Sequence, residues 1–202
     1  MCYVDKLVLS KPEAFQFTVN NIDATLCTHI IYSDLTITKN GDINQEDLKN
    51  LKELKELRNK NPNLKLMIST DLSKESISNV SDASYSFSVK KLYCSKLALV
   101  ILKTGFDGFD FRLEDGDSDN LETLKLINQR FGKKPGFVLS VDVAGSITKL
   151  SNFNNLKEIT DNVDFVNLRT YDFFGNSVRL IHDAPLYASP FGGFKLKLNV
   201  VS

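Results

Sequence analysis

The chain has 202 residues, of which 42% are hydrophobic and 25% are charged. This composition supports one hydrophobic core and excludes disordered and fibrous classes, so we expect a single domain over residues 1–202. Lys plus Arg and Asp plus Glu number 25 each, which leaves no long-range field to attract nucleic acid or an anionic membrane. The two histidines and three cysteines follow no zinc or redox spacing, so neither a metal nor a cofactor is expected.

Strand-like and helix-like patterns alternate along the chain. After a short strand at 1–4, the strand-like runs are 28–37, 64–70, 106–113, 137–144 and 163–171. Helical patterns are expected over 44–60, 86–103, 120–131 and 152–159. A repeated strand-helix order predicts a parallel sheet in an α/β protein. About six units are present, so the chain predicts an incomplete (β/α)₈ TIM-type barrel that lacks the C-terminal part of the fold.

An incomplete barrel has a consequence for association. An open parallel sheet leaves two strand edges unpaired, and such edges can bind another chain. Self-association through an open sheet edge is therefore one candidate interaction of this protein.

The most informative segment is residues 106–114, Phe-Asp-Gly-Phe-Asp-Phe-Arg-Leu-Glu. Side chains alternate across a strand, so Asp110, Arg112 and Glu114 share one face and rise toward the strand's C-terminal end, where barrel enzymes hold their catalytic groups. The segment resembles the fourth-strand signature D-G-x-D-x-D-x-E of glycoside hydrolase family 18, except that Arg112 replaces the third aspartate. Further segments resemble this family in the same order, at 26–32, 61–65, 165–175 and 182–187. The chain is thus similar to a family 18 chitinase-like protein over nearly its whole length.

This resemblance implies roles for particular residues. In the family, the signature glutamate protonates the glycosidic oxygen while the substrate's own acetamido carbonyl attacks the anomeric carbon. Glu114 matches that acid, and Asp110 matches a supporting carboxylate. Tyr32, Tyr171 and Asp172 match positions expected to contact chitin or N-acetylglucosamine oligosaccharides.

Arg112 does not fit the hydrolytic role of the residue that it replaces. The family's aspartate orients the acetamido N–H and stabilises a cationic intermediate, whereas a guanidinium is permanently charged and can only donate hydrogen bonds. Arg112 would also lower the pKa of Glu114, although an acid catalyst needs that pKa raised. In addition, Arg169 stands where the family has a methionine, and the chain has no tryptophan on which a sugar could stack.

Two arginines on the inner face need carboxylate partners, because an unpaired buried guanidinium is costly. We expect the salt bridges to come from Asp34, Asp110, Glu114 or Asp172. In one interpretation, these carboxylates form a surviving acid site, and in the other they simply pair with Arg112 and Arg169.

Three functions stay open at this point. The first is a catalytically inactive chitinase-like protein that binds chitin or N-acetylglucosamine oligomers weakly. The second is an active chitinase that hydrolyses β-1,4 linkages by substrate-assisted catalysis. The third is an interaction protein or a non-functional fragment.

Cys2 and Cys27 match a family disulfide that joins the first two strands. The resemblance predicts Cα atoms about 4.4 to 6.8 Å apart. A disulfide indicates an oxidising compartment, and the family resemblance favours an extracellular location, although no signal peptide precedes the first strand in this sequence.

Overall fold

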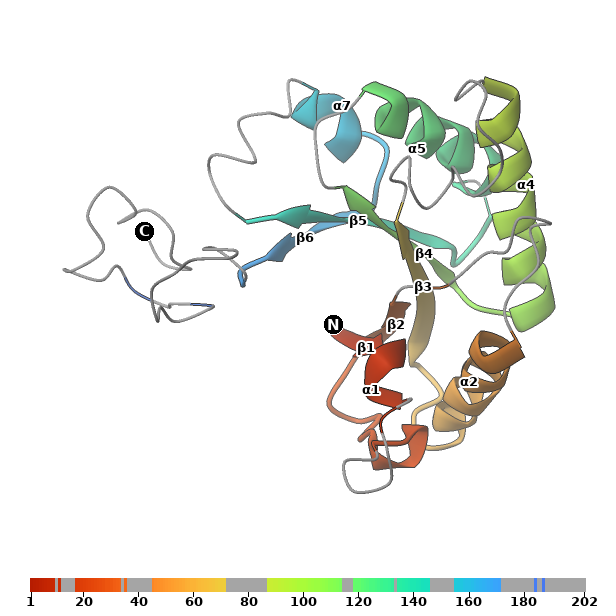
Figure 1. Cartoon of the computed structure of the whole chain (residues 1–202), viewed down its shortest axis with the longest axis vertical. Coiled ribbons are helices and arrows are strands. Elements are labelled where there is room, and N and C mark those ends of the chain that lie inside the picture. Colours follow the sequence, from red (N-terminus) through yellow and green to blue (C-terminus); the bar gives the residue numbers. More distant parts are fainter. Residues whose placement is uncertain are drawn as a thin grey trace.

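The computed structural model describes residues 1–9, 11, 17–33, 35, 45–71, 87–113, 118–132, 134–145, 155–171, 184 and 187. Six parallel strands form one sheet in sequence order. They are β1 (Cys2–Asp5), β2 (His29–Ser33), β3 (Lys65–Asp71), β4 (Gly108–Leu113), β5 (Val138–Ala144) and β6 (Phe165–Arg169). The sheet curves into an arc with the main helices on its outer side (Figure 1). This architecture confirms the prediction of an incomplete (β/α)₈ barrel.

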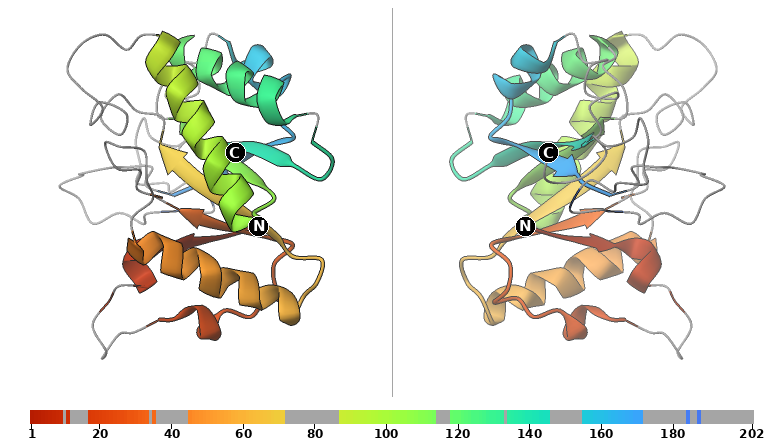
Figure 2. Two further views of the ribbon diagram at one scale, coloured as in Figure 1. Left: turned by 90° about the vertical axis from the view of Figure 1, so that its right-hand side faces the viewer. Right: turned by 90° about the vertical axis from the view of Figure 1, so that its left-hand side faces the viewer.

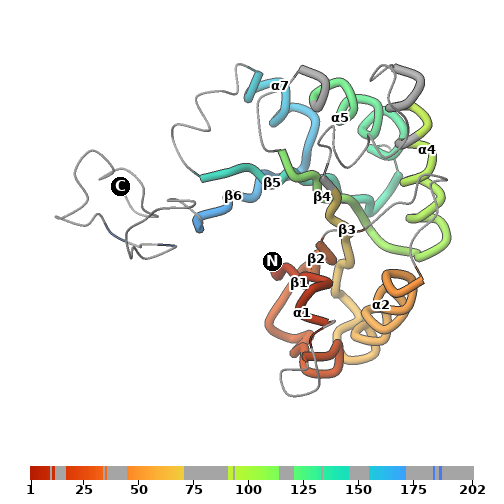
Figure 3. Tube along the Cα trace, viewed as in Figure 1, coloured from red at the N-terminus to blue at the C-terminus, as the bar shows by residue number. Residues whose placement is uncertain are grey.

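The helices connect successive strands along the outside of the arc, as the two side views show (Figure 2). They are α1 (Lys6–Leu9), α2 (Gln45–Glu56), α4 (Phe87–Thr104), α5 (Ser118–Phe131) and α7 (Leu156–Thr160), with 3₁₀ turns η2 (Val19–Asn21) and η3 (Leu57–Asn59). The chain trace in Figure 3 shows the same progression in sequence order from β1 to β6. No helix among the described residues is long and apolar enough to span a membrane.

Alternation along the strands separates the two faces of the sheet. Ile30, Leu66 and Phe109 face outward and belong to the main hydrophobic core. Phe109 packs edge-on against Phe131 of α5, with ring centroids 6.1 Å apart. Fully burying an apolar side chain of this size contributes roughly 1.5–3 kcal/mol, so each of these residues adds substantially to the stability of the fold. The other face carries the polar side chains described below.

Gly108 explains part of the signature segment in structural terms. A Cβ atom on this residue would overlap the backbone carbonyl of Val138, on the adjacent strand. Only glycine permits β4 and β5 to pair this closely at the start of β4.

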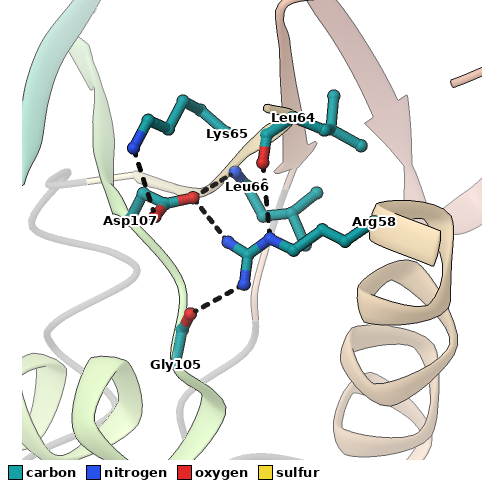
Figure 4. Close-up of polar contacts among 6 residues, drawn as sticks. All are labelled: Arg58, Leu64, Lys65, Leu66, Gly105 and Asp107. Atoms are coloured by element: carbon teal, nitrogen blue, oxygen red, sulfur yellow. Dashed lines mark hydrogen bonds and ion pairs between the residues drawn. The ribbon is translucent and has the colours of Figure 1, made fainter. Parts of the chain in front are cut away.

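Asp107 lies just before β4 and joins three segments of the chain (Figure 4). Its Oδ2 atom accepts hydrogen bonds from Arg58 Nη2 at 2.5 Å and from the Leu66 amide at 2.8 Å. Arg58 also donates to the backbone carbonyls of Leu64 and Gly105. This first aspartate of the signature therefore holds the N-terminal ends of β3 and β4 to the turn η3 that follows α2, and its role is structural.

The disulfide between Cys2 and Cys27 is present, with its Cα atoms 6.0 Å apart. It joins β1 to Cys27, which lies two residues before the start of β2. This confirms the disulfide that the family resemblance implied. The third cysteine, Cys94, is buried in α4. Burial raises the pKa of this thiol to about 11, so it remains a protonated and unreactive core residue at neutral pH.

Candidate active site

Asp110 is the centre of a polar network on the inner face of the sheet. It is fully buried and accepts hydrogen bonds from the hydroxyls of Tyr3 at 2.9 Å and Ser140 at 2.5 Å. The amide of Asn167 donates to it at 3.1 Å. Residues from β1, β4, β5 and β6 thus converge on one carboxylate. Burial raises the pKa of Asp110, while these hydrogen bonds oppose the rise.

The hydrogen bond to Asp110 also fixes the side chain of Tyr3. Burial is the main cause that raises the pKa of its phenol, and the charges of Asp110 and Asp142 raise it further. The hydroxyl therefore stays protonated and serves as a fixed hydrogen-bond donor to Asp110. This contact crosses the interior of the arc from β1 to β4.

A second cluster lies farther along the same strands. Arg112 Nε is 3.5 Å from Asp142 Oδ2, and Arg169 Nε is 3.1 Å from Asp142 Oδ1. The side chain of Asp142 is only 2% exposed. Burial raises the pKa of Asp142 to about 6, and the charge of Asp110 adds to the rise, whereas Arg169 and then Arg112 lower it.

Arg112 and Arg169 are ion-paired, as expected, but the partner among the described residues is Asp142, which the sequence analysis did not name. Both guanidinium groups lie on the inner face, as expected, and contact Asp142 of β5. Asp110 is instead engaged by hydroxyl and amide donors. Three of the other expected partners, Asp34, Glu114 and Asp172, lie outside the described residues.

The sequence did contain a signal for this partner. Ser140 and Asp142 are the polar residues at alternate positions of an otherwise apolar strand. The register pairs Asp142 with Arg112 on one side and with Asn167 on the other. The alternation of polar and apolar residues in β5 was enough to place Asp142 on the polar face. Its partners on the adjacent strands, however, depend on the register of the sheet.

Tyr32 does not occupy the position expected of a sugar contact. It is fully buried on the outer face, where its hydroxyl donates to Asp47 Oδ1 at 2.5 Å and accepts from Asn50 Nδ2 at 3.1 Å. Both partners belong to α2. Because successive side chains point to opposite faces of a strand, Ile31 and Ser33 face the interior and Tyr32 faces the helix. This placement corrects the expectation that Tyr32 contacts substrate.

Of the remaining expected site residues, the structure describes Tyr171. It follows β6 two residues beyond Arg169, and 51% of its surface is exposed. It therefore lies at the C-terminal end of the sheet with a face available to a ligand. Glu114, the expected acid, and Asp172 lie outside the described residues.

The described residues hold no cluster of three or more His, Cys, Asp or Glu side chains that could bind a metal ion. Asp110 and its donors satisfy one another in the buried part of the site, so what the described residues can offer a ligand is the partly exposed guanidinium groups of Arg112 and Arg169 and the ring of Tyr171. A protonated carboxyl of Asp142 would be available only near or below pH 6.

Comparison with known proteins assigns the chain to a class. The family model for glycosyl hydrolases family 18 matches residues 1–202. The chain therefore belongs to glycosyl hydrolase family 18, and its barrel strands and signature segment are those of a chitinase-like member.

The relatives are distant in sequence and longer than this chain. A probable chitinase 2 from Drosophila melanogaster is 24% identical over 99% of this chain and 46% of its own length. The human chitinase-3-like protein 2 is 25% identical over 92% of this chain and 52% of its own length. The chain thus spans about half the length of these curated relatives.

Solved structures support the fold. The Group IV chitinase of Ostrinia furnacalis superposes with a TM-score of 0.83 at 24% identity, over 98% of this chain and 59% of that structure. Human YKL-39, described as a pseudo-chitinase with retained chitooligosaccharide binding, superposes with a TM-score of 0.83 at 22% identity and the same coverage. At these identities the likeness establishes the barrel fold alone.

Proposed function

We propose that this chain is a chitinase-like protein that does not hydrolyse chitin and that binds N-acetylglucosamine oligosaccharides weakly. The observation that carries the proposal is the position of Arg112. It replaces the third aspartate of the family signature, and its Nε atom lies 3.5 Å from Asp142 Oδ2 on the inner face. A guanidinium cannot accept the substrate's acetamido N–H, and its charge opposes a cationic intermediate.

Asp142 does not compensate for the lost aspartate. It lies between two guanidinium groups, at 3.1 Å from Arg169 and 3.5 Å from Arg112. When Asp142 is ionised, the two guanidinium groups neutralise its charge. When Asp142 is protonated, it has no charge with which to stabilise a cationic intermediate. Electrostatic groups of this kind contribute about 10² to 10³ to the rate of an enzyme, so their loss is expected to abolish useful turnover.

Sugar binding is supported by the groups that remain. Tyr171 exposes half of its surface at the end of β6, and the buried network around Asp110 fixes the inner face of the neighbouring strands. A structural neighbour, human YKL-39, is described as a pseudo-chitinase with retained chitooligosaccharide binding. We expect weak affinity because the chain has no tryptophan to stack on a sugar ring.

The proposal includes the compartment in which the protein works. The disulfide between Cys2 and Cys27 needs an oxidising environment to form and persist. An extracellular location fits this requirement.

The test measures turnover and binding separately. Hydrolysis of a fluorogenic chitobioside should be less than about one hundredth of that of an active family member, in line with the loss of an electrostatic group. Titration calorimetry with chitotetraose should detect weak binding that Tyr171→Ala reduces. Leu168→Ala is the matched control, because Leu168 is equally exposed, at 54%, but lies on the opposite face of β6. Turnover comparable with an active member would instead establish a chitinase, and absent binding would leave only an interaction protein or a non-functional fragment.

A further inference from the structure

Helix α4 has apolar side chains on two opposite faces. One face, with Cys94, Leu97 and Ile101, is buried in the main core. The other face carries Leu92, Leu99 and Leu102, which are 49%, 53% and 69% exposed. We call these three residues the leucine stripe. A helix that buries only one apolar face normally has polar residues on the other, so the stripe needs an explanation.

The stripe has the spacing of a helix-packing seam. Leu92 and Leu99 are seven residues apart, and Leu102 follows three residues later. These are successive a, a and d positions of a heptad, which align along one side of a helix. Ser95 occupies the remaining d position, and its hydroxyl donates to the Lys91 carbonyl at 2.9 Å. Because that hydroxyl donates its hydrogen bond within α4, it needs no hydrogen-bond acceptor on a partner.

Positive charges border the stripe on both sides. Lys96 and Lys103 take the e positions and Lys91 takes a g position of the same heptads. No aspartate or glutamate occurs anywhere in α4. In helix pairs, residues at e and g select the partner by charge. The seam is therefore suited to a helix whose own flanking residues are acidic.

Two other occupants fit less well. A second copy of α4 would place lysine against lysine in either orientation, which is unfavourable. An anionic membrane would also meet α2 on the same outer wall, where Glu46, Glu53 and Glu56 offset Lys49, Lys52 and Lys55, so this wall offers it no broad positive surface. Figure 2 shows α4 running across the front of this wall in its left-hand view.

We propose that the leucine stripe and its flanking lysines form a docking site for an amphipathic helix of another protein, with apolar a and d residues and carboxylates at e and g. The site lies on the outer wall of the barrel, away from the sugar-binding face. It is independent of whether the protein binds or hydrolyses chitin.

The experiment uses a labelled synthetic peptide of about three heptads, with Leu at a and d and Glu at e and g, and measures fluorescence anisotropy with the full chain. Wild-type protein should bind this peptide, with affinity that falls as salt is raised. Leu99→Gln with Leu102→Gln should weaken binding by at least about tenfold, because the replaced side chains supply the apolar contact. The control Leu26→Gln, which changes a leucine that is 80% exposed outside α4, should leave binding unchanged.

A charge exchange tests the selectivity. Lys96→Glu with Lys103→Glu should weaken binding of the Glu peptide and strengthen binding of the same peptide with Lys at e and g. Lys52→Glu, on an exposed position of α2, should do neither. The proposal is overturned if wild-type protein ignores the Glu peptide or binds the Glu and Lys peptides equally. It is also overturned if the stripe variants instead abolish self-association, or if they abolish binding to vesicles of anionic lipid in the absence of peptide binding.

Discussion

Arg112 and Asp142 occupy paired positions on neighbouring strands, and the guanidinium of Arg112 meets the carboxylate of Asp142 at 3.5 Å. Arg169 approaches the same carboxylate at 3.1 Å from the next strand. Two cations thus share one anion on the face where chitinase-like proteins act on sugar. This arrangement links the departure from the family signature on β4 to residues on β5 and β6.

Asp142 should titrate near neutral pH. Its pKa is raised to about 6 by burial, so its carboxyl signal in a ¹³C NMR titration should move near pH 6 rather than near 4. Arg169→Gln and Arg112→Gln should each raise this pKa further, because both guanidinium groups lower it. A transition near pH 4 in the wild type would contradict the burial argument.

The raised pKa of Asp142 predicts how the stability of the protein depends on pH. A carboxyl whose pKa is higher in the folded state stabilises the fold fully below its unfolded pKa, and this contribution is lost as pH rises through the folded pKa. The free energy of unfolding of the wild type, measured relative to Asp142→Asn, should therefore fall between about pH 4 and pH 6 by on the order of 2 kcal/mol. Urea denaturation at each pH supplies both values. A difference that stays constant or increases over this range would show that the arginines outweigh burial.

Asp107 and Asp164 offer a matched pair at the N-terminal end of the sheet. Asp107 accepts from the Leu66 amide, and Asp164 accepts from the Leu139 amide, both at 2.8 Å. Asp107 also accepts from Arg58, and among the described residues no such arginine contact is seen for Asp164. Asparagine keeps an oxygen for the backbone amide but loses the charge. Asp107→Asn should therefore cost about 1–2 kcal/mol, and Asp164→Asn less than about 1 kcal/mol. If urea denaturation shows the same loss of unfolding free energy for both variants, the contact with Arg58 does not contribute to stability.

The disulfide should contribute measurably to stability. The Cys2–Cys27 bridge closes a segment with a sequence separation of 25 residues, for which chain entropy predicts about 3 kcal/mol. Cys2→Ser with Cys27→Ser should lower the free energy of unfolding by this amount. Dithiothreitol should destabilise the wild type to a similar extent and leave the double variant unaffected. A reductant effect of equal size on both proteins would point to some other cause.

The architecture was predictable because each strand-helix unit carries its own pattern. The apolar runs around Phe109 and Val141 and the leucine spacing of α2 need no long-range information, so the order of elements followed from the sequence. The disulfide followed from the family resemblance. Gly108 was part of the recognised motif, but the reason for it, the close carbonyl of Val138, belongs to the strand pairing.

The details of the site depended on relationships that a single segment does not contain. Asp142 acts through Arg112 and Arg169, which lie on two other strands, and only the register brings the three together. Tyr32 was assigned to the sugar side by family position, whereas the phase of β2 turns it toward Asp47 and Asn50. Strand phase and register are set by packing across the whole sheet, which explains why these two points were missed.

Restoring the signature aspartate by Arg112→Asp should not restore hydrolysis. The change would place a new carboxylate beside Asp142, which lies opposite position 112 in the register, and adjacent carboxylates raise each other's pKa. Arg169 would remain 3.1 Å from Asp142, so a positive charge would persist in the site, and the chain would still contain no tryptophan. We expect turnover of the fluorogenic chitobioside to remain within about twofold of the blank. In an intact site, by contrast, a single electrostatic group can raise the rate by a factor of about 10² or more. The matched comparison is Arg112→Asp combined with Asp142→Ala and Arg169→Met, which removes both the competing carboxylate and the second cation. A hundredfold gain from Arg112→Asp alone would show that Arg112 is the sole defect, and the neighbouring charges of Asp142 and Arg169 would then have no part in silencing the site.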